Sequence, residues 1–139
     1  MTSVECSGSC LCGAVRYRAA GQLLRFTLCH CGRCRKATGS AHTSNIMLTQ
    51  GTVEWTEGED LLRRYKVPES ERYSTCFCGI CGSPLPRLIS QTGMVAIPAG
   101  SLDEAPGLMP QAHIFWDSRA EWLTPEADLP RHGEYPPGS

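Results

Sequence analysis

Hydrophobic and polar residues alternate over several short segments of the chain, which is typical of β-strands with one face in a core. Residues 15–18 show this alternation, and residues 24–28 repeat it. The second segment leads directly into Cys29 and places that side chain on the face away from its apolar residues. We therefore expect two strands near the start of the chain, the second of which positions a cysteine.

Further short strands are expected between clusters of Gly and Pro. They are residues 44–48 and 52–55, separated by a turn at Gln50-Gly51, followed by 61–67, 72–77, 94–97 and 113–116. Residues 35–39 predict a single helical turn that ends at Gly39. The sequence contains no long amphipathic segment. The pattern as a whole predicts a mainly β fold of antiparallel strands.

The length of 139 residues predicts a single domain over residues 1–139. A hydrophobic content of 41% is compatible with a folded core, which we expect over about residues 6–123. Residues 124–139 are rich in proline and show little periodicity, so we expect a loose tail there.

The charge balance limits the classes of partner. The formal net charge is −1 and the isoelectric point is near 6.4, which gives no field for nucleic acid or an anionic membrane surface. No apolar run approaches the roughly 20 residues that span a bilayer. The first residues lack a basic segment followed by an apolar one, so we expect no signal peptide and a cytoplasmic protein.

Nine cysteines are the unusual feature of the composition, and most of them stand in C-x-C or C-x-x-C groups. In a reducing compartment such groups favour metal binding over a framework of disulfides. We therefore expect zinc rather than disulfide bonds.

Three cysteines fall within six residues, at Cys29, Cys31 and Cys34. The first two point the same way on an extended segment, and Gly32 lets the backbone fold back so that the third thiol reaches the same point. Three thiolates suit Zn²⁺. A catalytic zinc keeps an open fourth position, whereas a fourth ligand from elsewhere would make the site structural. The spacing alone leaves both alternatives open.

Two ways of dividing the cysteines between zinc sites compete. In the first, Cys10, Cys12, Cys78 and Cys81 form a closed four-thiolate zinc site. In the second, Cys31 and Cys34 join Cys78 and Cys81 as a zinc ribbon, which leaves Cys10, Cys12 and Cys29 without partners and the C-x-C spacings unexplained. We favour the first pairing because, with the group of three as a second site, it uses seven cysteines.

The other cysteines and the histidines receive weaker predictions. Cys76 is expected to be a half-buried core thiol, and Cys6 to lie in a mobile N-terminus without a role. His30 points away from the flanking cysteines if the segment is extended, so we expect it to pack or to lie on the surface. His42 and His113 are expected to form hydrogen bonds rather than to bind metal.

Positive charge lies within and directly after the group of three cysteines along the chain. Arg33, Arg35 and Lys36 either form a solvated face or anchor a carboxylate of a substrate. The sequence does not decide between these roles.

Together these groups resemble the glutathione-dependent formaldehyde-activating enzyme family. The matching segments are GSCLCGAV at 8–15, CHC at 29–31, CRKATG at 34–39, FCGICGSPL at 77–85, HIFWDS at 113–118, LP at 129–130 and EYP at 134–136. The resemblance covers nearly the whole chain, and the combined cysteine spacing is specific.

The resemblance implies an all-β fold of folded antiparallel sheets, often called a β-tent, with two zinc ions per chain. It implies a structural zinc on Cys10, Cys12, Cys78 and Cys81, and a catalytic zinc on Cys29, Cys31 and Cys34. The implied activity is that of a carbon–sulfur lyase, which joins glutathione and formaldehyde to S-hydroxymethylglutathione.

A zinc held by three thiolates fits this chemistry, since it can bind a substrate thiol as thiolate and lower its pKa. No residue of the sequence is an obvious general base. The alternative is a zinc-stabilised binding module without turnover. An open fourth position at the group of three would favour the enzyme.

Overall fold

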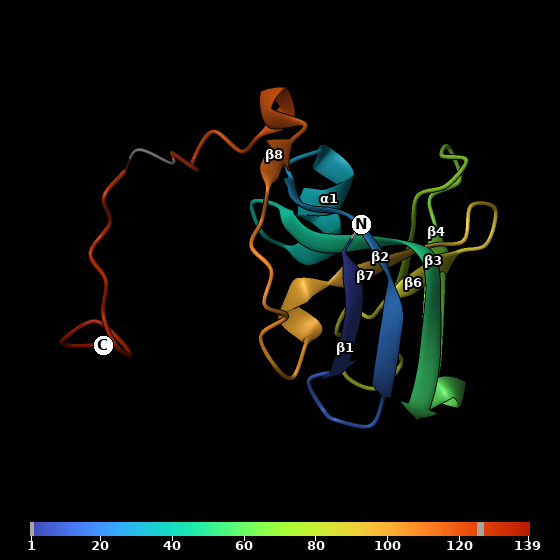
Figure 1. Ribbon diagram of the computed structural model, residues 1–139. Coiled ribbons are helices and arrows are strands. Elements are labelled where there is room, and N and C mark those ends of the chain that lie inside the picture. Colours follow the sequence, from blue (N-terminus) through green and yellow to red (C-terminus); the bar gives the residue numbers. More distant parts are fainter. Residues whose placement is uncertain (1, 125–126) are drawn as a thin grey trace.

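A computed structural model describes residues 2–124 and 127–139 and shows a mainly β fold of antiparallel sheets, as predicted. The larger sheet has the order β1-β2-β3-β7-β6, with β8 paired to β2, and the smaller sheet consists of β4 and β5 (Figure 1). The strands are β1 (Ser3–Ser9), β2 (Arg16–Cys29), β3 (Thr43–Glu57), β4 (Leu62–Lys66), β5 (Ser74–Cys78), β6 (Arg87–Ile89), β7 (Met94–Pro98) and β8 (Ala112–Ile114). The helical segments are α1 (Gly32–Thr38), η1 (Glu59–Leu61), η2 (Ala99–Ser101) and η3 (Trp116–Ser118).

Strands β2 and β3 are longer than the sequence pattern suggested. Each of them joins two expected short strands, and they pair with each other along their length with shifts in register. The predicted turn at Gln50-Gly51 is wrong. Gln50 instead takes a left-handed backbone with φ of 50° inside β3, and a Cβ on Gly51 would lie 2.6 Å from the Val95 side chain. A bulge of this kind bends a strand without ending it.

Residues 3–9 form a strand, contrary to the expectation that Cys6 lies in a mobile segment. Strand β1 pairs with β2 from Ser3 to Ser9, and Cys6 packs half-buried against the core. The short, mixed segment of β1 gave no alternation strong enough to predict this edge strand.

Helix α1 begins earlier than expected and ends where expected. Cys31 caps its start, because its Sγ accepts a hydrogen bond from the Cys34 N–H. Gly39 ends it in the left-handed conformation with φ of 63°, and its N–H donates to the Arg35 carbonyl. The two residues between Cys31 and Cys34 are therefore helical rather than a turn.

The expected strand over 113–116 is shifted and interrupted. Strand β8 pairs in parallel with the end of β2, and Phe115 then adopts a left-handed backbone with φ of 53°. This change of direction starts η3 and turns Phe115 away from the strand path.

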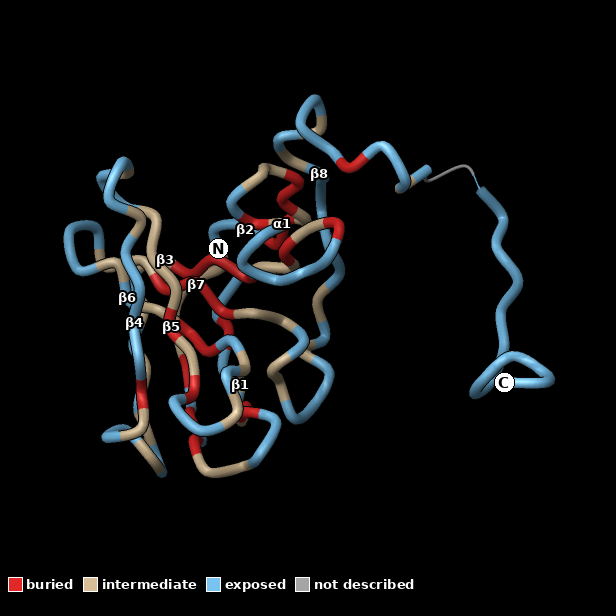
Figure 2. The backbone as a smooth tube through the Cα atoms, turned by 180° about the vertical axis from the view of Figure 1, so that it is seen from behind, coloured by how far each residue is buried: buried red, intermediate tan, exposed pale blue. Residues whose placement is uncertain are grey.

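The core lies between the larger sheet and the sheet of β4 and β5, and strands β1, β2 and β3 cover one side of it (Figure 2). Its most deeply buried side chains are Val15, Tyr17, Ile46, Leu48, Val95, Ile97 and Cys78. Residues 127–139 run away from this body as an exposed tail. Within the described residues, no helix has the length and apolar character needed to cross a membrane.

Candidate functional site

Four cysteines from two distant parts of the chain meet at one point. The Sγ atoms of Cys10, Cys12, Cys78 and Cys81 all lie within 4.8 Å of one another, and we call them the four-cysteine cluster. The first pair follows β1, and the second pair lies at the end of β5 and in the turn after it. The structure thus brings together the residues of the first pairing rather than those of a zinc ribbon.

The turns around the four-cysteine cluster direct backbone N–H groups at sulfur. The N–H of Val15 donates to Cys10 Sγ at 3.3 Å, and the N–H of Ile80 donates to Cys78 Sγ at 3.4 Å. Backbone hydrogen bonds at Cys81 lower the pKa of that thiol to about 6. Such contacts stabilise thiolates, the form that binds metal.

The sulfur positions fit a tetrahedral zinc. Zn–S bonds of about 2.3 Å place the sulfur atoms of a tetrahedron about 3.8 Å apart. The Sγ atoms of Cys10 and Cys12 are 3.6 Å apart, and those of Cys12 and Cys78 are 3.9 Å apart. Both the donor set and its spacing are therefore compatible with the predicted structural metal.

Cys29, Cys31 and Cys34 form a second group, the three-cysteine cluster, whose Sγ atoms also lie within 4.8 Å of one another. Cys29 ends β2, Cys31 caps α1, and Cys34 lies in the first turn of that helix. Burial raises the pKa of the Cys29 thiol to about 12. For Cys31 burial acts in the same direction, but hydrogen bonds from the Cys34 N–H and from the neighbouring thiols lower its pKa overall.

The described part of the chain places three ligands, and not four, at the three-cysteine cluster. Within residues 2–124 and 127–139, no fourth His, Cys, Asp or Glu side chain joins it. A metal held there would keep a coordination position for a ligand from outside the chain. Three protein ligands and an open position are typical of a catalytic zinc, whereas a structural zinc has four protein ligands.

A cavity of about 500 Å³ lies against the three-cysteine cluster. Its lining consists of Arg25, Thr27, Cys29, Cys31, Gly32, Arg33, Cys34, Asn45, Met47, Tyr73, Arg87, Ile114 and Phe115. Three of these described lining residues are arginines and none is acidic, so the cavity favours an anionic ligand. A second cavity, of about 450 Å³, lies beside η3 and has no cysteine in its described lining.

The sequence identified only part of this positive charge. Arg33 lines the cavity as expected, whereas the lining does not include Arg35 or Lys36. Arg25 and Arg87 were missed. The alternation in β2 contained the signal for Arg25, because Arg25 and Cys29 share one face of that strand. That face borders the cavity instead of being freely solvated.

Tyr73 is the other residue that the sequence did not predict. It immediately precedes β5, and its hydroxyl donates a hydrogen bond to Cys34 Sγ at 3.4 Å. Burial and then the contact with Cys34 raise the pKa of Tyr73, so the phenol keeps its proton. No local pattern links these two residues, which are 39 positions apart.

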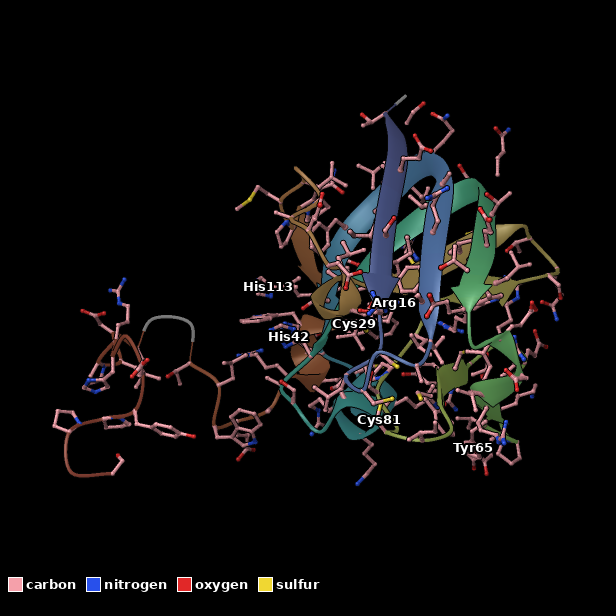
Figure 3. All side chains as sticks on the ribbon, turned by 90° about the horizontal axis from the view of Figure 1, so that it is seen from below. Arg16, Cys29, His42, Tyr65, Cys81 and His113 are labelled. Carbon is pink, nitrogen blue, oxygen red and sulfur yellow. The ribbon has the colours of Figure 1, made fainter. Side chains whose placement is uncertain are left out.

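Three of the four histidines pack together, since the ring centroid of His30 lies 5.0 Å from those of His42 and His113. Figure 3 shows His42 and His113 in the same region of the view as Cys29. His30 is fully buried, and its Nε2 shares a hydrogen bond of 2.8 Å with Nδ1 of His113. His42 Nδ1 contacts the Thr43 carbonyl at 3.1 Å. His30 therefore packs, as one of the two expected alternatives, and the other two histidines form the hydrogen bonds that were expected.

The remaining cysteines stay outside both clusters. Cys76 is 3% exposed, so it is more deeply buried than expected, and burial raises the pKa of its thiol. Cys6 is half-buried in β1, and burial raises its pKa as well. Neither residue belongs to a group that could hold a metal in the described part of the chain.

Comparisons with known proteins add to this geometry. No curated protein shows significant similarity to the chain. A crystal structure of a Rhodobacter sphaeroides protein, solved as a structural genomics target, has a TM-score of 0.54 at 21% identity and covers 77% of this chain and 97% of its own. This likeness shows a shared fold. Residues 5–118 match the family described as glutathione-dependent formaldehyde-activating enzyme, and the chain therefore belongs to that family.

Proposed function

We propose that the protein is a zinc-dependent carbon–sulfur lyase that joins a small thiol to an aldehyde. The family supports glutathione and formaldehyde as substrates, with S-hydroxymethylglutathione as product. The observation that carries the proposal is the unclosed three-cysteine cluster at a cavity with a positively charged lining.

Two zinc ions per chain have different roles in this proposal. The four-cysteine cluster would hold a structural ion, because its four thiolates complete a tetrahedron. Cys29, Cys31 and Cys34 would hold the second. Zinc at that position would supply an open coordination site that lowers the pKa of a substrate thiol.

The lining residues select and enclose the thiol substrate. Glutathione carries two carboxylates, and guanidinium groups bind carboxylates with charge-assisted hydrogen bonds. Arg25, Arg33 and Arg87 would hold these groups, while the apolar side chains of Met47 and Phe115 exclude water from the reacting atoms.

The reaction is an addition that needs no oxidant or reductant. The thiol sulfur forms a bond to the aldehyde carbon, and the electron pair of the carbonyl π bond moves to the oxygen. That oxygen takes up the proton that the thiol released. The main contribution of the chain is to hold both reactants together, and such proximity can supply a large share of a rate enhancement.

The decisive experiment compares wild type with Cys31→Ser. Zinc content per chain, glutathione binding by calorimetry and glutathione-dependent formaldehyde consumption are measured for both proteins. We expect two zinc ions in wild type and one in the variant, with loss of thiol binding and turnover but not of the fold. Cys6→Ser is the matched control, since Cys6 lies outside both clusters.

Two results would contradict the proposal. A Cys31→Ser variant that keeps both zinc ions would show that Cys31 is not a ligand. A wild type that binds two zinc ions but neither binds nor consumes any small thiol or aldehyde would identify a zinc-stabilised binding module instead.

A further inference from the structure

Tyr73 reaches the three-cysteine cluster from the smaller sheet. Its hydroxyl donates to Cys34 Sγ at 3.4 Å, while Cys34 itself lies in α1. Tyr73 also lines the cavity, so its phenol lies between a cysteine of the cluster and the space for substrate.

Several contacts hold the ring in this orientation. The guanidinium carbons of Arg33 and Arg87 lie 5.9 and 5.5 Å from the ring centroid, within the range of cation–π attraction. The backbone is held as well, because the Tyr73 N–H donates to Ser70 Oγ at 3.0 Å and its carbonyl accepts from the Val67 N–H. Loss of the hydroxyl alone would therefore leave the ring in place.

We propose that Tyr73 is a positioning residue that donates a hydrogen bond to the Cys34 thiolate and thereby tunes the metal bound by the three-cysteine cluster. This rests on the metal assigned to that cluster under the proposed function. A hydrogen bond to a ligating sulfur withdraws electron density from it. Three thiolates over-neutralise a divalent ion, and the hydrogen bond offsets part of that excess so that the ion attracts a further thiolate more strongly.

The test uses Tyr73→Phe with cobalt in place of zinc, because Co²⁺ bound by thiolates gives sulfur-to-metal absorption bands. For each protein, the spectrum of a version that also carries Cys29→Ser is subtracted. The difference then contains only the absorption of cobalt at the three-cysteine cluster. We expect the band of Tyr73→Phe at longer wavelength than that of wild type, since the Cys34 sulfur becomes a better electron donor. We also expect thiol affinity to fall by about tenfold.

Tyr65→Phe is the matched control. Tyr65 lies in β4 of the same small sheet, is 53% exposed, and stands apart from Cys29 in Figure 3. Its variant should have the wild-type band.

The possible outcomes distinguish a failure of the Tyr73 proposal from a failure of the lyase proposal. An unchanged band in Tyr73→Phe, or an equal shift in Tyr65→Phe, would overturn the role of Tyr73 and leave the lyase proposal standing. A shifted band in a protein that binds no thiol would support the hydrogen bond from Tyr73 to the Cys34 ligand, and would contradict both its expected effect on thiol affinity and the lyase proposal. If wild type gave no difference band at all, the three-cysteine cluster would bind no metal, and both proposals would be wrong.

Discussion

At the scale of single residues, the cavity beside the three-cysteine cluster depends on side chains that come from separate elements. Arg25 belongs to β2, Arg33 to α1 and Arg87 to β6. Arg87 is the least exposed of the three, and its Nη1 donates to the Arg72 carbonyl at 3.3 Å, which fixes its direction. A fixed, partly buried guanidinium loses little conformational entropy when it binds a carboxylate.

We therefore expect Arg87→Met to weaken the binding of thiols that carry carboxylates. A charge-assisted hydrogen bond of about 1.5–3 kcal/mol corresponds to an increase in KM of roughly 10- to 100-fold for glutathione. The KM of an uncharged thiol such as 2-mercaptoethanol should stay almost unchanged. Both values are obtained from initial rates of formaldehyde consumption.

Arg18→Met serves as the control, because Arg18 is exposed on β2 and its Nη1 lies 4.0 Å from Oε2 of Glu54. Equal losses for the charged and the uncharged thiol in Arg87→Met would show that Arg87 supports the cavity wall rather than the carboxylate.

At the scale of elements, the sequence predicted the type of most strands but not where they continue. Alternation identified β5 closely, and short segments that end at a proline identified β4 and β7. The sequence pattern failed at Gln50, because a bulge leaves the same Gly-containing signature as a turn. It also missed β1, whose pairing with β2 depends on contacts between residues far apart in sequence. Cysteine spacing was more informative, since metal ligands must converge whatever the path of the chain.

The connection after β3 needs a glycine at position 58. Gly58 has φ of 76°, and a Cβ there would overlap the carbonyl oxygen of Ala14. We expect Gly58→Ala to lower the free energy of unfolding by about 2–4 kcal/mol, from backbone strain and this overlap together.

Gly93→Ala is the control, with φ of 69° and open space around the new methyl group. It should lower the free energy of unfolding by only about 1 kcal/mol. Urea denaturation measures both, and equal losses would show that the overlap is relieved by a shift of the chain.

A side-chain hydrogen bond between β2 and the segment after β7 predicts that stability depends on pH at high pH. The Tyr17 side chain is 2% exposed and its hydroxyl shares a hydrogen bond of 2.6 Å with Ser101 Oγ. Burial raises the pKa of Tyr17 from 10.0 to about 12. Between these values the folded state keeps a proton that the unfolded state loses, so the free energy of unfolding falls as pH rises from 10 to 12.

Tyr17→Phe removes that titration. The variant should be less stable than wild type by about 1 kcal/mol near neutral pH, since a hydrogen bond is lost. Its stability should then fall less than that of wild type between pH 10 and pH 12 in thermal melts. Parallel pH profiles for the two proteins would contradict the assignment.

At the scale of the whole molecule, the four-cysteine cluster joins the start of the chain to the end of β5, 66 residues apart between Cys12 and Cys78. The three-cysteine cluster lies within six neighbouring residues and connects no distant segments. Metal at the first cluster would therefore contribute to folding, whereas metal at the second would have a smaller effect on stability.

Cys78→Ser is accordingly expected to lower the melting temperature by at least roughly 10 °C, because loss of a structural metal costs several kcal/mol. Cys31→Ser should melt within a few degrees of wild type. Circular dichroism melts and zinc content, measured on the same samples, check both expectations. A Cys78→Ser protein that melts like wild type would exclude a structural role for the cluster.

Tyr73 stands directly before the first residue of β5, and Cys78 is the last residue of that strand. This strand of about 17 Å, with Tyr73 at its start, therefore has one end at each cysteine cluster. We expect loss of metal at Cys78 to loosen β5 and, with it, the hydrogen bond from the Tyr73 hydroxyl to Cys34 Sγ. If the clusters are coupled in this way, metal at one would raise the metal affinity of the other, and by thermodynamic reciprocity the factor would be the same in both directions. The four-cysteine cluster would then favour metal at the three-cysteine cluster, and assembly of the proposed reactive site would depend on a completed fold.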